Sequence, residues 1–206
     1  NSSEKYMELM QHAEEHGIII GKLGLDLSKF MQRKEKIVKQ LTTGIGFLFK
    51  KNKITHLTGT ASFIDEKNIK IKSTNEVTIS AKNFIIATGS SSISIPNIEV
   101  DEEKIVTSTG ALSLSSVPEK MLVIGGGYIG LEMGSVWSRL GAKVTVVEAL
   151  DRITPTMDLE IANHFMKSLS KQGIEFKLSH KVISAQSHSN DVEVTMESIK
   201  DKKEFK

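Results

Sequence analysis

The pattern of apolar positions predicts different architectures for the two parts of the chain. In the first part, apolar residues recur at helical spacing in residues 4–16 and 28–51, and alternate with polar residues between 54 and 88. Helical spacing predicts two amphipathic helices, and alternation predicts half-buried strands that pair in a small antiparallel meander. A fully apolar run at 84–87 predicts one more strand, and the serine-rich stretch 90–96 predicts a surface connection.

After Pro118 the pattern changes to buried strands that alternate with helices. Strands are predicted at residues 121–124 and 144–147 around a helix at 129–140, and a second helix is predicted at 158–171. Three further strands are predicted at residues 175–178, 182–185 and 192–196. This α/β order predicts a parallel sheet with crossover helices, and Pro118 is the predicted domain boundary.

Three glycines with GxGxxG spacing, Gly125, Gly127 and Gly130, lie between the first of these strands and its helix. The first glycine allows a tight turn, the second lets the backbone approach a pyrophosphate, and the third lets the helix pack closely on the strand. The pyrophosphate would accept hydrogen bonds from amides at the helix N-terminus, where Tyr128 and Ile129 lie. A glycine-rich turn alone often serves only close packing, but the flanking strands and helix here favour dinucleotide binding.

Glu148 ends the second strand, about 20 residues beyond the glycines, where a carboxylate accepts hydrogen bonds from the adenosine ribose. It would repel a 2′-phosphate, so the sequence predicts NAD rather than NADP. The alternatives are a solvated strand end at Glu148, or an NADP site that uses the nearby Arg152. Glu132 follows the last glycine by two residues, and the pattern alone favours a simple interaction with the helix dipole.

Composition narrows the possible functions. The chain has 206 residues, and 27 Lys and Arg against 25 Asp and Glu give a net charge of +2, which makes no case for nucleic acid or an anionic membrane as a partner. No apolar run reaches the roughly 18 residues that span a bilayer, and the polar N-terminus lacks the order of a secretory signal, so a cytosolic or organelle interior is expected. The absence of cysteine excludes thiolate chemistry within these residues, and we expect no metal site.

These segments together resemble the dihydrolipoamide dehydrogenase family of class I pyridine nucleotide-disulfide oxidoreductases. The resemblance extends over essentially all 206 residues. It is carried by VIGGGYIGLEMGSVW at 123–137, and by residues 139–141, 144–148, 150–153, 155 and 157–158. Upstream it is carried by residues 40–42, 44–45, 48–53 and 85–90. It implies an incomplete FAD-binding domain in residues 1–118 and, in 119–206, a Rossmann-like NAD-binding domain that lacks its C-terminal part.

The resemblance also implies an activity and a setting. Such an enzyme is an FAD-containing homodimer that reoxidises the dihydrolipoyl groups of 2-oxo acid dehydrogenase complexes and reduces NAD. Its partners are the lipoyl domains of those complexes. It works in the cytoplasm, or in the mitochondrial matrix if the source is eukaryotic.

Individual positions take their expected roles from the same resemblance. The FAD contacts would be Ala61, Thr88, Gly89 and Ser90, and the NAD contacts would be Gly125, Gly126, Gly127, Tyr128, Ile129, Gly130, Glu132, Glu148 and Val182. Ala61 stands where family members often have glycine, so its contact would be through the backbone. The resemblance revises Glu132 towards a position near the flavin and nicotinamide. Tyr128 would either cover the flavin face or simply pack.

The family's redox chemistry depends on a CxxxxC disulfide and on a His–Glu pair from the partner subunit's interface domain. The resemblance places the first before Asn1 and the second after Lys206, and none of the six histidines has the catalytic setting. No catalytic residue is therefore predicted here, and we expect a catalytically silent fragment with a tendency to aggregate. The alternatives are a truncated product that only binds dinucleotide, and another flavin disulfide reductase such as a mercuric reductase.

Overall fold

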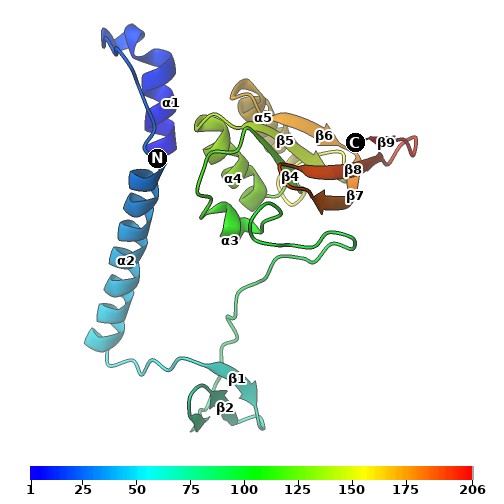
Figure 1. Ribbon diagram of the computed structural model, residues 1–206. Helices are drawn as coiled ribbons and strands as arrows, with labels where there is room; N and C mark the ends of the chain where they lie inside the picture. The colour runs from blue at the N-terminus through cyan, green and yellow to red at the C-terminus, as the bar shows by residue number, and fades with distance from the viewer. Residues whose placement is uncertain (206) are drawn as a thin grey trace. The chain divides into compact units, whose positions relative to one another are not determined.

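A computed structural model of the chain describes residues 1–205 (Figure 1). Internal contacts group the chain into two compact units, each of which is described by itself. The first combines Asn1–Gln32 with Ser92–Lys206, and the second is Arg33–Ser91. Pro118 lies inside the first unit. Its predicted role, as the boundary between an FAD-binding and an NAD-binding portion, therefore stays a prediction.

The first unit is built around a three-stranded parallel sheet with the order β4-β5-β6. Strands β4 (Lys120–Ile124) and β5 (Lys143–Glu148) are joined by helix α4 (Tyr128–Arg139), and β5 leads through α5 (Leu159–Lys171) to β6 (Glu175–Leu178). Figure 1 shows both helices packed beside this sheet. The predicted alternation of strands and helices from residue 121 to residue 178 is confirmed.

The core of this unit forms because β5 has neighbours on both edges and α4 on one face. Val144 and Val146 in β5 are 1% and 0% exposed, and Leu131 in α4 is 0% exposed. Trp137 is also buried, and its indole N–H donates to the carbonyl of Ala111 at 3.0 Å. This contact ties α3 (Ser108–Ala111) to α4.

Strands β7 (His180–Ser187), β8 (Val192–Ser198) and β9 (Glu204–Phe205) form a separate antiparallel sheet in the order β7-β8-β9. The prediction that this region continues the parallel sheet is wrong, although the strands themselves were predicted. One residue, Ser179, separates β6 from β7, and four residues separate β7 from β8. A crossover between parallel strands needs about a dozen residues, so these connections allow only hairpins and sharp turns.

The N-terminal helices contribute to the same core. Helix α1 (Ser2–His12) is followed by a 3-10 turn, η1 (Glu14–His16), and Gly17, at φ +70°, ends the segment. The helix predicted for residues 4–16 is thus present but ends earlier. The guanidinium of Arg139 donates to the hydroxyl of the buried Ser3 at 3.3 Å, which joins α1 to α4.

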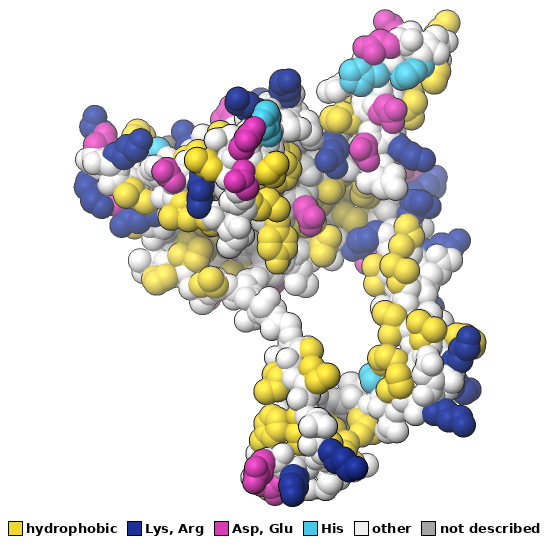
Figure 2. Space-filling model, turned by 180° about the vertical axis from the view of Figure 1, so that it is seen from behind, with side chains coloured by type: hydrophobic (Ala, Val, Ile, Leu, Met, Phe, Trp, Pro, Cys, Tyr) yellow, Lys and Arg dark blue, Asp and Glu magenta, His cyan; other side chains and the backbone are white. Residues whose placement is uncertain are grey.

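The second unit contains most of helix α2 (Leu27–Lys51) and a small antiparallel sheet. Its strands are β1 (Thr60–Phe63), β2 (Asn68–Lys72) and β3 (Glu76–Ser80), in sequence order. The predicted long helix and the predicted meander are both confirmed. Their side chains remain largely accessible: none of residues 33–91, all of which the structure describes, is buried, and Figure 2 shows hydrophobic side chains on the surface.

The strand predicted at residues 84–87 is absent, and this segment has no regular structure. Phe84 contacts the ring of Phe63 with 5.1 Å between centroids, but Ile85 and Ile86 are 92% and 73% exposed. A fully apolar strand requires neighbours in a sheet and cover on both faces, and the described residues supply neither here. Among the helices of residues 1–205, none combines the length and the hydrophobicity that a membrane span needs.

Candidate dinucleotide-binding site

The glycine-rich turn leaves three helix amides free of intrahelical partners. Gly125 adopts φ +101°, a conformation that favours glycine, and its amide donates to the carbonyl of Val147 in β5 at 2.8 Å. The first hydrogen bond of α4 runs from the amide of Leu131 to the carbonyl of Gly127 at 3.1 Å. The amides of residues 128–130 therefore precede the helical ladder, as an anion site at a helix N-terminus requires.

The glycines of the turn differ in the space around them. An added Cβ at Gly130 would lie 2.8 Å from the carbonyl oxygen of Gly125 and 2.9 Å from Cγ1 of Val123, so close helix–strand packing requires glycine. At Gly127, no atom lies within 4 Å of the corresponding position. The closed third glycine and open second glycine match the roles that their spacing predicts.

Glu148 lies directly beside this turn and is fixed by two backbone amides. Its Oε2 accepts from the amide of Gly126 at 2.6 Å, and its Oε1 accepts from the amide of Leu150 at 2.8 Å. The side chain is half-buried, so a freely solvated strand end does not describe it. Each carboxylate oxygen keeps a further lone pair that a hydroxyl group could use.

Arg152, the alternative partner for a 2′-phosphate, is engaged elsewhere. Its Nη2 donates to the carbonyl of Pro155 at 2.8 Å, within the loop that follows β5. The structure therefore puts a carboxylate against the glycine turn and ties Arg152 to the loop backbone.

The remaining predicted contacts of the dinucleotide lie at the start of α4 and in β7, and they differ in exposure. Tyr128 and Ile129 are 66% and 47% exposed at the start of α4, and Glu132 is exposed one turn later. Val182 is half-buried in β7, opposite Met196 at a β-bulge. The turn before β7 reaches the site loop, because the amide of Ser179 donates to the carbonyl of Leu150 at 2.9 Å.

The predicted flavin contacts lie in the second unit. Ala61 is in β1, opposite Ile71, whereas Thr88, Gly89 and Ser90 follow in the irregular segment. All four are exposed, and no hydrogen bond described for residues 1–205 joins Ala61 to the other three. These residues alone do not enclose a flavin.

Two contacts to the site were not predicted. The amide of Thr154 donates to the carbonyl of Gly126 at 2.9 Å, and Cγ2 of Ile153 lies 3.0 Å from where a Cβ on Gly126 would be. Ile153 and Thr154 are 1% and 4% exposed. They lie in an irregular loop, where no periodicity reveals which residues turn back to the sheet. The sequence resemblance to a known family includes Ile153 of this loop but not Thr154.

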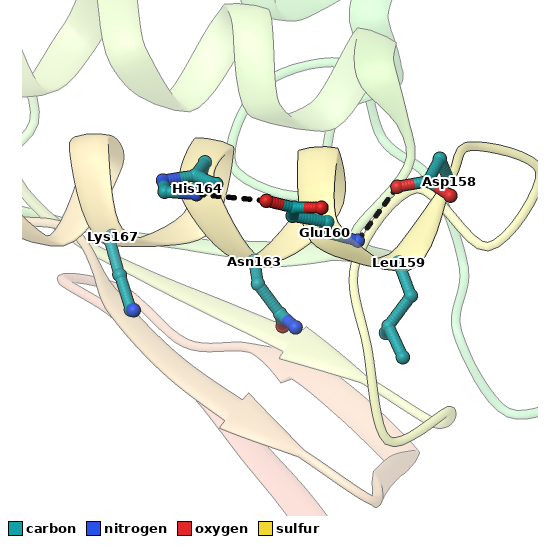
Figure 3. Close-up of a pocket in the computed structure, with 6 residues that line it drawn as sticks. All are labelled: Asp158, Leu159, Glu160, Asn163, His164 and Lys167. Atoms are coloured by element: carbon teal, nitrogen blue, oxygen red, sulfur yellow. Dashed lines mark hydrogen bonds and ion pairs between the residues drawn. The ribbon is translucent and has the colours of Figure 1, made fainter.

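A separate open pocket lies along α5 (Figure 3). Its lining comes from this helix and its N-cap: Asp158, Leu159, Glu160, Asn163, His164 and Lys167. His164 lies beside Glu160 with 3.9 Å between nitrogen and oxygen, and both side chains are mostly exposed. One exposed helix face with a weak ion pair offers no convergent chemistry, so the glycine turn remains the better candidate site.

The parallel strand–helix–strand unit and its glycine turn have the arrangement of the dinucleotide-binding fold. Comparison with known proteins leads to the family. A family profile described as pyridine nucleotide-disulphide oxidoreductase matches residues 4–206. The chain belongs to this family, whose members in general use a flavin and a nicotinamide cofactor.

Individual proteins similar to this chain support the same family assignment. The mitochondrial dihydrolipoyl dehydrogenase of Schizosaccharomyces pombe is 50% identical over 206 residues, which cover 98% of this chain and 40% of that protein. The mitochondrial dihydrolipoyl dehydrogenase of Pisum sativum is 46% identical over 199 residues, which cover 96% and 40%. The crystal structure of LpdA from Mycobacterium tuberculosis matches the fold with a TM-score of 0.83 at 22% identity, over 99% of this chain and 44% of that one. The chain thus spans about 40% of the length of these curated relatives.

Proposed function

We propose that this chain provides the NAD-binding portion of a dihydrolipoyl dehydrogenase. The observation that carries the proposal is the Glu148 carboxylate, which Gly126 and Leu150 fix beside the open backbone of Gly127. The pyrophosphate would be held by the amides that precede the ladder of α4, and the adenosine ribose by Glu148. Bound NAD would supply the hydride-accepting nicotinamide.

The fixed carboxylate favours NAD over NADP. A 2′-phosphate would place roughly two negative charges near Glu148. Because Glu148 is half-buried, the repulsion between them is only partly screened. Arg152 offers little compensation, because its guanidinium already donates to Pro155. The ribose hydroxyls of NAD instead supply donors for the remaining lone pairs of the carboxylate.

The complete reaction is proposed for the whole enzyme. The relatives are named dihydrolipoyl dehydrogenases, which favours the oxidation of dihydrolipoyl groups of 2-oxo acid dehydrogenase complexes with FAD and NAD. We propose lipoyl domains as partners, a homodimer as the assembly and the mitochondrial matrix as the location. Because these 206 residues contain no cysteine, they hold no thiol that could take electrons from a dithiol.

Titration calorimetry with NADH and NADPH tests the dinucleotide site. We expect the chain to bind NADH more tightly than NADPH, and Glu148→Ala to weaken NADH binding about 10- to 100-fold through loss of charge-assisted hydrogen bonds. Glu175→Ala, which removes an exposed carboxylate from β6, is the matched control and should leave both affinities unchanged. Equal affinity of wild type and Glu148→Ala for NADH would exclude the proposed ribose contact.

An activity assay tests the assignment of the thiol step. With FAD, NAD and dihydrolipoamide added, the 206-residue chain should produce no NADH, as followed by absorbance. Sustained NADH production that depends on dihydrolipoamide would show that a cysteine-free polypeptide can carry the whole electron path, and would contradict the proposal.

A further inference from the structure

We propose that Thr154 is a positioning residue that aims the amide of Gly127 at the dinucleotide pyrophosphate. The inference rests on the proposed NAD site and deepens it, because it assigns a role to a residue of the loop between β5 and α5. It follows from the backbone conformation of Thr154, from its hydrogen bonds and from the geometry of one peptide group.

The backbone conformation and the burial of Thr154 both lower the stability of the folded chain. It is β-branched with φ +43°, a left-handed conformation that such residues rarely adopt. It is only 4% exposed, and its hydroxyl oxygen has no hydrogen-bond partner among the residues that the structure describes. A strained backbone and an unsatisfied buried hydroxyl both lower stability. Because both occur in one residue, other contacts must hold the backbone of Thr154 in this conformation.

The backbone hydrogen bonds of Thr154 are the contacts that hold it. Its amide donates to the carbonyl of Gly126 at 2.9 Å, and its own carbonyl accepts from the amide of Met157 at 2.9 Å. On its other side, Gly126 donates its amide to Glu148 at 2.6 Å. Both peptide groups that flank the Cα atom of Gly126 are therefore held by the segment from Glu148 to Thr154. We call this pair of hydrogen bonds to Gly126 the clamp.

The orientation of one peptide group links this clamp to the ligand. In a trans peptide the C=O and the following N–H point in opposite directions, and the described chain has no cis peptide bond. Because the carbonyl of Gly126 points to Thr154, the N–H of Gly127 points away from Thr154. Gly127 is exposed, and no atom lies within 4 Å of the place that a Cβ on it would take, so a pyrophosphate has room to approach this residue and accept from its N–H.

A clamped peptide also explains the absence of room at Gly126. A Cβ there would lie 3.0 Å from Cγ2 of Ile153 and 3.3 Å from both Cγ and Oε2 of Glu148. The loop after β5 therefore packs directly on this residue. Gly126 serves loop closure, whereas Gly127 serves ligand approach.

Amide hydrogen exchange of the 206-residue chain, with and without saturating NADH, tests the clamp without any mutation. If NADH binding uses the Gly127 amide, it stabilises the peptide that Thr154 holds, so exchange of the Thr154 amide should slow about tenfold more than global stabilisation explains. The buried amide of Ala142, which donates to Trp137 at 3.0 Å beyond the far end of α4, reports that global contribution. Equal slowing at Thr154 and Ala142 would overturn the proposal.

Two variants separate the backbone of residue 154 from its side chain. Thr154→Val keeps the amide and replaces the unpartnered hydroxyl with a methyl group of similar size, so its affinity for NADH should stay within about twofold of wild type. Thr154→Pro removes the amide and cannot adopt φ +43°, so its affinity should fall about tenfold or more. If Thr154→Pro does not fold, the exchange measurement on the wild type decides. A loss in Thr154→Val as large as in Thr154→Pro would transfer the role to the hydroxyl and overturn the proposal.

Calorimetry on the same samples distinguishes failure of the proposed NAD site from failure of the role of Thr154. Wild-type chain that binds no NADH would overturn the proposed function and this inference together. Wild-type chain that binds NADH, with exchange at Thr154 no slower than at Ala142, would overturn this inference alone.

Discussion

Two short apolar segments, residues 144–147 and residues 84–87, show what sequence pattern does and does not determine. The sequence of each segment alone predicts a buried strand. The first is part of β5, where Val144 and Val146 are 1% and 0% exposed. In the second, Ile85 and Ile86 are 92% and 73% exposed and no strand forms. The difference lies in their neighbours, because β5 is paired with β4 and β6 and covered by α4.

The same contrast separates the two units as wholes. The first unit buries nine hydrophobic residues in one cluster around β5, whereas no residue of 33–91 is buried. An amphipathic helix such as α2 gains most of its stability from packing of its apolar face. The same type of substitution should therefore lower the free energy of unfolding strongly around β5 and only slightly in residues 33–91. Trp137, the single tryptophan, allows this to be measured, because its fluorescence reports on the first unit.

The largest expected effect is Leu131→Ala compared with Leu41→Ala. Leu131 is 0% exposed and Leu41 is 64% exposed. The first change removes buried methyl groups and leaves a cavity, so the free energy of unfolding should fall by about 2–5 kcal/mol. The second should change it by less than about 0.5 kcal/mol. Urea titrations followed by Trp137 fluorescence and by circular dichroism test both values, and similar losses would show that residues 33–91 are packed in solution.

Two glycines, Gly130 and Gly44, allow the same contrast to be measured at single positions. In Gly130→Ala the new Cβ would lie 2.8 Å from the backbone oxygen of Gly125, so the free energy of unfolding should fall by about 1–3 kcal/mol and NADH binding should weaken. In Gly44→Ala the Cβ meets no atom within 4 Å, and the helix should gain about 0.5–1 kcal/mol of local stability. Helical circular dichroism during thermal melts measures both. An increase in stability for Gly130→Ala would contradict the packed turn.

The parts that could be predicted from sequence are those governed by local rules. The turn glycines and Glu148 were identified because spacing along the chain sets their places around one tight turn. The strands and helices from residue 121 to residue 178 followed from periodicity. Connection lengths, which are also in the sequence, could have corrected the pairing of β7 and β8, since four residues cannot contain a crossover helix.

The parts that could not be predicted depend on contacts between distant segments. Whether Ile85 and Ile86 are buried depends on neighbouring strands, which their own sequence does not specify. The hydrogen bond between Thr154 and Gly126 joins residues 28 positions apart, and no residue-type preference favours threonine at a positive φ. Spacing thus located residues that lie around the glycine turn, whose contacts with a dinucleotide stay a prediction, and it did not locate Thr154, which supports that turn.

Helix N-caps extend the comparison with a smaller effect. Asp158 accepts from the amides of Glu160 and Ile161 at 2.9 and 3.3 Å and caps α5, which buries Ala162 and Leu169. Asp158→Ala should therefore lower the free energy of unfolding, followed by Trp137 fluorescence, by about 1 kcal/mol.

The matched variant lies at the start of α2. Asp26 accepts from the amide of Lys29 at 3.0 Å, but α2 contains no buried residue. Asp26 lies in the part of the chain that belongs to the first unit, but it gives α2 a single capping hydrogen bond, so Asp26→Ala should fray the first turn and shift the Trp137 midpoint less than Asp158→Ala does. Equal shifts of that midpoint in the two variants would show that the N-terminal turn of α2 unfolds together with the parallel sheet.

The smallest expected effect is a dependence on acid pH that differs between the units. Hydrogen bonds from the side chain of Asn68 and the amide of Lys67 lower the pKa of Asp65 in the second unit. Hydrogen bonds from the amides of Glu103 and Ile105 lower the pKa of Asp101 in the first. In each case the ionised form is favoured in the folded state, so its stabilisation is complete above the unfolded pKa and is lost as the pH falls through the folded pKa.

The consequence can be measured between about pH 5 and pH 2, which includes the ordinary aspartate pKa of 3.8. Asp101→Asn should reduce the loss of stability of the first unit over this range, as followed by urea midpoints from Trp137 fluorescence. Asp65→Asn should leave those midpoints unchanged, because its hydrogen bonds lie within a turn of the other unit. An equal effect of the two variants would mean that the units unfold cooperatively, and the contrast between residues 144–147 and 84–87 would then describe burial but not stability.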